Sequence, residues 1–374
     1  MIPVDTTKDA ATKDAATKDA AKKDTAKKDD SKKGPAKPEE KPKPPFPGWE
    51  LDAPKQIADC KHGAGLLGCW FDPSGKWLYT SGQDNVISRW DFVGNKRVDL
   101  AGHGSWVKSL GFWPGKNLVI SGGYEGLLIV WPIEGVQPEP LRQVTAHTGW
   151  IRAVAVEPTN GLVVSAGNDG QIALWQLPSL APVRRWSGHD CHIYQAAFRD
   201  NGKEIITADL KANVRVWDTA TGKLLREGKP VASLHKFDAG FGADIGGVRG
   251  WGANANGDRV ACAGITNVSN AFAGVGNPLI QVIDPKTLKV VQEHKSKEAY
   301  QGTMWGVAFH PAGFVLGVAG GSGGMLWIWK ADQAEPLRTL KQPDNIRGMA
   351  LSADGSKIAV AQANGSARVL NLKA

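Results

Sequence analysis

Short apolar segments that end in tryptophan recur along most of the chain. Five of them occupy residues 87–90, 128–131, 172–175, 214–217 and 326–329, and residues 280–283 and 367–370 have the same shape without the tryptophan. Their last positions are 90, 131, 175, 217, 283, 329 and 370, so the spacings are 41, 44, 42, 66, 46 and 41 residues. Such a period indicates a repeat architecture, in which each unit buries its apolar face against its neighbours.

A second set of positions repeats in register with these segments. A histidine slot lies 28 residues before each of the first four tryptophans, a hydroxyl residue ten before and an acid six before. The fourth repeat differs, because Lys211 stands in its acid slot. The residues in register are His62, Thr80, Asp84 and Trp90; His103, Ser121, Glu125 and Trp131; His147, Ser165, Asp169 and Trp175; and His189, Thr207 and Trp217.

Each repeat also has the alternation of a half-buried strand. Apolar residues stand seven and nine positions after the histidine slot, as in Leu110 and Phe112 or Val154 and Val156. This period of two buries one face of a strand. Turn-forming residues follow, for example Asp-Pro-Ser-Gly at 72–75. We therefore predict four strands in each repeat, and seven such sheets around an axis would bury each other's faces.

These spacings, together with Trp-Asp dipeptides at 90–91 and 217–218, resemble those of the WD-repeat family over about 327 of 374 residues. The resemblance implies an all-β fold, a seven-bladed β-propeller of four-stranded antiparallel blades. It also implies that the repeated His, Ser or Thr, acid and Trp form a structural hydrogen-bond network within each blade. We expect this network to be incomplete in the fourth repeat. We expect it to be absent from the last three, whose slots hold Asp244, Tyr300 and Gln342.

The two ends of the repeat region are predicted to meet in one blade. The last repeat stops near Leu370 without a fourth strand, whereas residues 54–60 look like a fourth strand without a blade. We therefore expect residues 54–60 to close the last blade of a propeller spanning 48–374. Residues 1–47 are rich in Lys, Ala and Asp and then in Pro, and are predicted to be a disordered N-terminal tail.

Composition narrows the setting of the protein. The formal net charge is +8, and 12 Lys against 9 Asp and Glu in residues 1–47 contribute only +3 of it. Neither residues 1–47 nor the rest of the chain is basic enough to favour nucleic acid as the partner. The four cysteines form no CxxC pair, and neither a secretory signal nor a membrane-spanning apolar run is seen. A reduced, cytoplasmic setting is expected.

Catalytic and metal-binding interpretations of the repeated residues are disfavoured. A Ser-His-Asp triad serves one nucleophile at one site, whereas three similar copies in three repeats favour a structural role. The four slot histidines fall in different blades, too far apart to share one metal ion. No catalytic residue, metal or cofactor is therefore predicted.

Candidate binding residues follow from the same register. In the family, the positions three and five after the slot mark the mouth of the central channel on the top face. The residues before the acid slots lie nearby, as does an insertion near residues 266–276 of the fifth repeat. The predicted partner-binding residues are Trp106, Lys108, Tyr124, Trp150, Arg152, Asn168, His192, Tyr194, Arg249, Phe272, Trp305 and Arg347. Such residue types are enriched in binding hot spots and suit an acidic peptide. Alternatively, the tryptophans cap the channel or pack between blades.

The sequence favours a non-enzymatic interaction scaffold that binds a protein or peptide segment on the top face of the propeller. One alternative is a propeller-based sensor of a small ligand, or an enzyme. Another is a nucleic-acid-associated adaptor, whose affinity would fall steeply with salt because phosphate contacts would drive binding.

Overall fold

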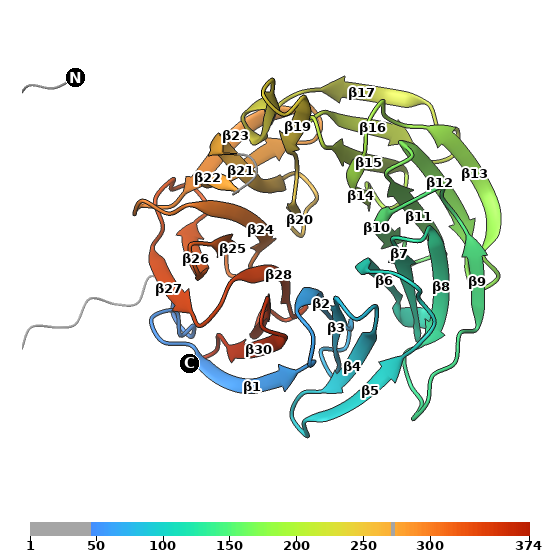
Figure 1. Cartoon of the computed structure of the whole chain (residues 1–374), viewed down its shortest axis with the longest axis horizontal. Helices are drawn as coiled ribbons and strands as arrows, with labels where there is room; N and C mark the ends of the chain where they lie inside the picture. The colour runs from blue at the N-terminus through green and yellow to red at the C-terminus, as the bar shows by residue number, and fades with distance from the viewer. Residues whose placement is uncertain (1–45, 271–273) are drawn as a thin grey trace, which may run out of the picture. The chain divides into compact units, whose positions relative to one another are not determined.

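The computed structural model describes residues 46–270 and 274–374, which form seven four-stranded antiparallel sheets around a central axis (Figure 1). The predicted all-β, seven-bladed propeller is therefore confirmed. Each sheet, or blade, runs from an inner strand beside the axis to an outer strand at the periphery.

The first four blades follow the chain from the axis outward. Their strands are β2 (Leu66–Phe71), β3 (Leu78–Gly82), β4 (Ile87–Asp91) and β5 (Lys96–Leu100) in blade one; β6 (Val107–Trp113), β7 (Leu118–Gly123), β8 (Leu127–Pro132) and β9 (Arg142–Thr145) in blade two; β10 (Ile151–Val156), β11 (Leu162–Gly167), β12 (Gln171–Gln176) and β13 (Ala181–Ser187) in blade three; and β14 (Ile193–Arg199), β15 (Glu204–Asp209), β16 (Val214–Asp218) and β17 (Leu224–Gly228) in blade four. A 3-10 turn, η1 (Pro114–Lys116), lies between β6 and β7.

The last three blades have the same order, with two departures. Their strands are β20 (Gly250–Ala253), β21 (Val260–Asn270), β22 (Val275–Asp284) and β23 (Lys289–Lys295) in blade five; β24 (Gly302–Phe309), β25 (Phe314–Gly321), β26 (Gly324–Lys330) and β27 (Arg338–Gln342) in blade six; and β28 (Ile346–Leu351), β29 (Lys357–Gln362), β30 (Ser366–Asn371) and β1 (Lys55–Lys61) in blade seven. The irregular stretch before blade five forms η2 (Ala232–Leu234) and a hairpin of β18 (His235–Asp238) and β19 (Ala243–Gly246). The predicted insertion lengthens the β21–β22 hairpin.

Blade seven joins the two ends of the described chain. Strand β1 pairs antiparallel with β30 and forms the outer strand of that sheet. Upstream of β1, the backbone N–H of Glu50 donates to the carbonyl of Leu372 at 2.8 Å. The Trp49 ring meets the His310 ring edge-on at 4.2 Å, which ties this segment to blade six as well.

Hydrophobic clusters fill the spaces between adjacent blades. Within the described residues there are seven such clusters, one at each junction around the ring. Between blades two and three, for example, Ile120 and Val130 pack with Ile151 and Val163. A four-stranded sheet has two faces to bury, and the ring buries both without a separate second layer. The core is therefore distributed around the ring.

The direction of the strands defines the face on which a partner has access. Every inner strand begins at the same end of its sheet, and neighbouring strands are antiparallel. Consequently the loops that enter the inner strands and the turns between second and third strands share one face of the ring. We call this the top face.

Candidate functional site

The repeated polar residues form hydrogen-bonded quartets inside the blades. In blade one, the His62 ring nitrogens lie 2.9 Å from Thr80 Oγ1 and 3.1 Å from Asp84 Oδ1, and Trp90 Nε1 donates to Thr80 Oγ1 at 2.9 Å. A carboxylate only accepts, so the imidazole donates to the acid and accepts from the hydroxyl, whose oxygen then accepts from the indole. Blades two and three repeat this chain through His103, Ser121, Glu125 and Trp131 and through His147, Ser165, Asp169 and Trp175.

Blade four has a complete quartet, so the prediction that it lacks its acid is wrong. Asp209 Oδ2 accepts from His189 Nδ1 at 2.8 Å, and the chain continues through Thr207 to Trp217. Burial alone would raise the pKa of Asp209, but hydrogen bonds from His189 and Asn213 outweigh it and lower that pKa. Lys211 lies instead 3.4 Å from Asp244 of the neighbouring hairpin.

A glycine explains why the acid of blade four comes from an unexpected position. Asp209 ends its strand at the pairing position that Gly82 occupies in blade one. A Cβ on Gly82 would lie 2.4 Å from both His62 Nε2 and Asp84 Oδ1, so the glycine leaves room for an acid two residues later. In blade four the Asp209 side chain fills that room itself and reaches the histidine directly. The same contact is thus built from a different position in the sequence.

The histidines of the four quartets are buried, whereas their acids range from buried in blade four to partly exposed in blade one. Each slot histidine has no exposed side-chain surface, and each pairs only with residues of its own blade. Buried polar groups that are fully paired fix a unique packing. The geometry assigns these quartets to architecture and leaves the channel as the candidate site.

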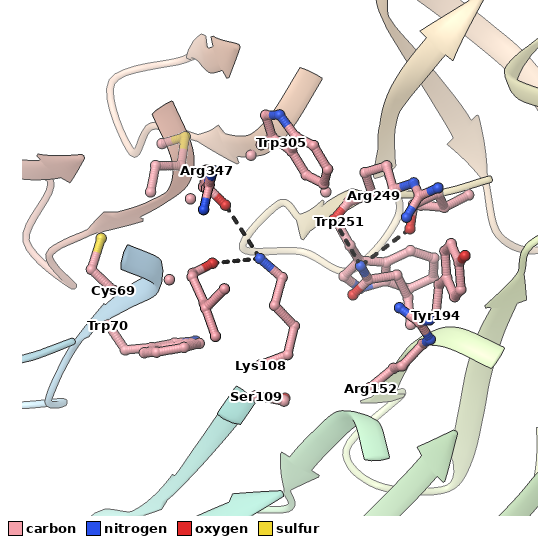
Figure 2. Close-up of a pocket in the computed structure, with 18 of the residues that line it drawn as sticks. Cys69, Trp70, Lys108, Ser109, Arg152, Tyr194, Arg249, Trp251, Trp305 and Arg347 are labelled. Atoms are coloured by element: carbon pink, nitrogen blue, oxygen red, sulfur yellow. Dashed lines mark hydrogen bonds between the residues drawn. The ribbon is translucent and has the colours of Figure 1, made fainter. Parts of the chain in front are cut away.

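The central channel holds a cavity of about 610 Å³ lined by residues from the inner strand of every blade (Figure 2). Its wall contains Leu67 and Trp70 of blade one, Lys108 of blade two, and Arg152 of blade three. The remaining blades contribute Tyr194, Arg249, Trp251, Trp305, Arg347 and Met349, among others. Cations and aromatic rings thus converge on one space.

Backbone bulges turn most of these side chains into the channel. In six of the seven inner strands the pairing with the second strand skips one residue near the top face. A β-bulge of this kind leaves the extra residue unpaired and re-aims its side chain. The skipped residues are Leu67, Lys108, Arg152, Tyr194, Trp305 and Arg347. Five of these six are predicted site residues, so one backbone device repeated around the ring presents them.

Aromatic side chains form a partly exposed rim at the blade-two and blade-three side of the mouth. We use "rim" for Trp106, Tyr124 and Trp150. The Tyr124 and Trp150 rings stack with centroids 4.2 Å apart and planes 5° apart. Trp106 Nε1 donates to the carbonyl of Gln83 at 3.0 Å. Trp106 and Trp150 remain 38% and 42% exposed, so their rings are anchored yet open to a partner.

Four cations line the cavity, three of them against aromatic rings, and we call Lys108, Arg152, Arg249 and Arg347 the "throat". The Arg152 guanidinium lies 4.3 Å from the Tyr194 ring centre and 4.8 Å from that of Trp150. Arg249 contacts the same tyrosine at 4.7 Å. Cation–π contacts of this kind hold a guanidinium in place without neutralising its charge.

No carboxylate balances the throat. The cavity wall contains no Asp or Glu, and no throat residue forms an ion pair within the part of the chain that the structure describes. Lys108 Nζ donates instead to the carbonyls of Leu67 and Arg347. Its pKa is lowered to about 8, first by burial and then by the three throat arginines.

Two of the predicted residues that the structure describes lie apart from the cavity wall. Asn168 supports the site from outside, because its Oδ1 accepts from Arg152 Nε at 2.5 Å. His192 lies beside the mouth, and burial together with the charge of Arg152 lowers its pKa. Phe272 lies outside the described residues.

Sequence reasoning missed two tryptophans and a glutamine of the cavity wall. Trp251 lies seven positions after the slot residue Asp244, where the alternation predicts packing between sheets, and Trp70 lies eight positions after His62, where it predicts no role. Gln195 Nε2 donates to the carbonyls of Val248 and Arg249 at 3.3 and 3.2 Å, which links blade four to the throat. A large residue between two glycines, as in Gly250-Trp251-Gly252, is the one local signal that could have been used.

Two other features bear on the kind of site. Across residues 46–270 and 274–374, no group of three or more His, Cys, Asp and Glu side chains is arranged to hold a metal ion. In the same ranges, no helix has the length and apolar character needed to cross a membrane.

Comparison with protein families identifies the repeats. The model of the WD domain, G-beta repeat, matches residues 55–91, 94–132, 138–176 and 180–218. None of the curated proteins compared with the chain matches it. The four matched segments span β1 to β16, and blades five to seven continue the same four-stranded construction around the ring. Residues 55–218 therefore consist of WD repeats, and the seven-bladed ring is consistent with a WD-repeat family.

Proposed function

We propose that the protein is a non-enzymatic interaction scaffold that docks an acidic peptide or protein segment at the mouth of its central channel. WD-repeat propellers typically mediate protein–protein interactions. The observation that carries the proposal is a concave cavity with four cations, aromatic walls and no acid among its lining residues. Such a site is complementary to a partner that supplies the missing negative charge.

The rim and the throat make different contributions to binding. The exposed rings of Trp106 and Trp150 offer rigid apolar area at little entropic cost, as hot-spot aromatics do. The throat offers charge in a half-buried recess, where charged hydrogen bonds are stronger than at an open surface. A segment that lays its backbone on the rim and directs acidic side chains into the recess would use both.

Selection from a random-peptide display library tests this function. We expect the wild-type protein to enrich sequences rich in Asp and Glu. The variant Trp150→Ala plus Arg152→Ala should bind the selected peptides at least roughly tenfold more weakly, a loss of about 1.4 kcal/mol or more.

The outer strand of blade two supplies the matched control. Leu141 and Arg142 are exposed neighbours far along the sheet from the channel, so Leu141→Ala plus Arg142→Ala also removes one apolar group and one guanidinium. This control should bind like wild type. Equal peptide binding by both double variants, at matched thermal stability, would remove the proposed site.

A further inference from the structure

The throat holds more positive charge than an acidic side chain can balance. Its four cations come from blades two, three, five and seven, and all four residues line the same cavity (Figure 2). Lys108 Nζ contacts the carbonyl of Arg347 at 3.3 Å, and Arg152 and Arg249 flank the single ring of Tyr194. The charges therefore converge instead of forming a track along the surface.

Two of the residues that line this recess have donors that no hydrogen bond of the described residues uses. A protonated lysine has three N–H groups, and Lys108 uses two of them on backbone carbonyls. The Arg347 guanidinium makes no ion pair or side-chain hydrogen bond with any residue in the described ranges. An anion in the throat would thus meet donors from several directions.

The number and type of these donors decide between anions. A carboxylate carries one negative charge and two acceptor oxygens, so it would leave most of the throat unbalanced. A phosphate monoester carries a charge of about −1.5 to −2 at pH 7 and has three strong acceptor oxygens. Guanidinium groups match phosphate through paired N–H···O bonds, and three of the four throat cations are arginines.

We propose that the throat is a binding site for a phosphate monoester dianion, held by Arg152, Arg249 and Arg347 with Lys108 beneath. This inference deepens the proposed docking function and rests on it for the carrier of the phosphate, which is a phosphorylated side chain of the docked segment. A free phosphate ion offers the same chemistry, and the experiment separates the two sources.

Lys108 provides a readout of its own. Since the pKa of its ammonium is lowered to about 8 by burial and by the three arginines, a sizeable fraction is deprotonated near that pH. A dianion in the throat offsets the positive field and favours the charged form. Binding at pH 8 should therefore draw protons from solution, and this uptake should disappear in Lys108→Met.

Calorimetric titration with phenyl phosphate and benzoate tests the site directly. Both probes carry one aromatic ring, so they differ mainly in the anion. At constant ionic strength, we expect phenyl phosphate to bind at least tenfold more tightly than benzoate. Arg249→Gln and Arg347→Gln should each weaken phenyl phosphate binding by about tenfold or more, as expected for a lost charged hydrogen bond.

Controls keep the outcome interpretable. Arg142→Gln removes an exposed arginine from the outer strand β9 and should bind phenyl phosphate like wild type. Proton uptake is measured on the wild-type protein in buffers of different ionisation enthalpy. This measurement therefore does not depend on whether any variant folds. Equal binding of the two probes, or equal binding by Arg142→Gln and the two throat variants, would overturn the phosphate site.

The display-selected peptide separates this inference from the docking function. If a partner carries the phosphate, replacing one acidic residue of that peptide by phosphoserine should tighten peptide binding. The phosphopeptide should then also bind more tightly than inorganic phosphate does. Equal affinity for inorganic phosphate and the phosphopeptide would assign the site to the free ion. If the unphosphorylated peptide binds through Trp150 while phenyl phosphate does not bind, docking stands and the phosphate site falls.

Discussion

Blades one to four and blades five to seven build the same four-stranded sheet with different internal contacts. The first group has four buried quartets that link an acid, a histidine, a hydroxyl and a tryptophan. In the second group, Tyr300 occupies the histidine slot of blade six, packs edge-on against Trp327 at 5.2 Å and donates to the carbonyl of Gly323. Trp329 Nε1 donates to the backbone of Lys295 rather than to a hydroxyl.

This comparison distinguishes the contacts that form a blade from the residues that make its sequence recognisable as a repeat. All seven junctions between blades are filled by apolar clusters, with or without quartets. The family model matches only the stretch that carries the quartets, residues 55–218. Burial between sheets therefore sets the ring, whereas the quartets are one of two ways of tying a blade together.

Deleting the strand that closes the ring between blade seven and blade one should have the largest effect on stability. Removal of residues 46–61 deletes β1 and takes the buried residues Leu51 and Cys60 out of two apolar clusters. A buried leucine alone contributes about 1.5–3 kcal/mol, and the unpaired edge of β30 adds to the loss. Because net stabilities are about 5–15 kcal/mol, we expect cooperative thermal unfolding to be lost.

Deletion of residues 1–45 is the control for that experiment. Among the described residues, the contacts that join the N-terminal segment to blades six and seven begin at Phe46, whose ring lies 4.9 Å from that of Phe314. The melting temperature of the ring should therefore stay unchanged. A folded ring after the longer deletion would contradict the role of β1 as the closing strand.

Within blades one to four, burial of the acid should rank the quartets. The Asp209 side chain is 1% exposed and that of Asp84 is 35% exposed. Asp209→Ala leaves a buried imidazole N–H without an acceptor, which costs about 1–3 kcal/mol. Asp84→Ala should cost less, because water can reach the vacated position. Urea unfolding would measure both losses.

Lys211→Ala is the matched control in blade four. Its ammonium is largely exposed and pairs with Asp244 at 3.4 Å, so its loss should change the free energy of unfolding by less than about 0.5 kcal/mol. If Lys211→Ala destabilised the protein more than Asp209→Ala, the quartet described for blade four would be wrong.

The repeat spacing predicted the blades because strand and turn lengths, similar in every sheet but that of blade five, set the distance between slots. Lys108 and Arg152 were placed in the channel by the same register, but the bulges that aim them depend on pairing with a second strand. Asp209 was missed because a side chain can substitute in space for one two residues away. Trp251 was missed because strand alternation does not tell the channel from a neighbouring blade.

The decrease of stability at acidic pH should reveal a buried histidine that hydrogen-bonds to the backbone and not to a carboxylate. His310 of blade six accepts from the backbone N–H of Ala312 at 3.0 Å and donates to the carbonyl of Gly355 at 2.9 Å, which requires a neutral ring. Burial lowers its pKa in the folded state. As pH falls below about 6.5, the unfolded chain takes up a proton that the folded chain does not, so stability falls.

The variant His310→Gln should flatten this dependence. We expect the free energy of unfolding to decline less steeply from pH 6.5 to pH 5 than it does in wild type. Chemical denaturation at several pH values measures the two slopes. Identical slopes would mean that His310 is not held neutral by its surroundings.

Trp150 at the rim should contribute little to stability. Trp150 is 42% exposed and its main partner is the stacked ring of Tyr124, so Trp150→Ala should cost less than about 1 kcal/mol. Trp131 is fully buried and donates to Ser121, so Trp131→Ala should cost about 3–5 kcal/mol. Thermal unfolding of the two variants would compare a binding indole with an architectural one; similar losses would erase that distinction.

The indole N–H signals of the 15 tryptophans test the central claim most directly. In a tryptophan-labelled sample titrated with the display-selected acidic peptide, we predict that the signals of residues at the mouth and in the cavity move, namely Trp70, Trp106, Trp150, Trp251 and Trp305. The quartet signals of Trp90, Trp131, Trp175 and Trp217 should stay in place. Saturable binding that leaves the first set unmoved would contradict the channel mouth as the docking site.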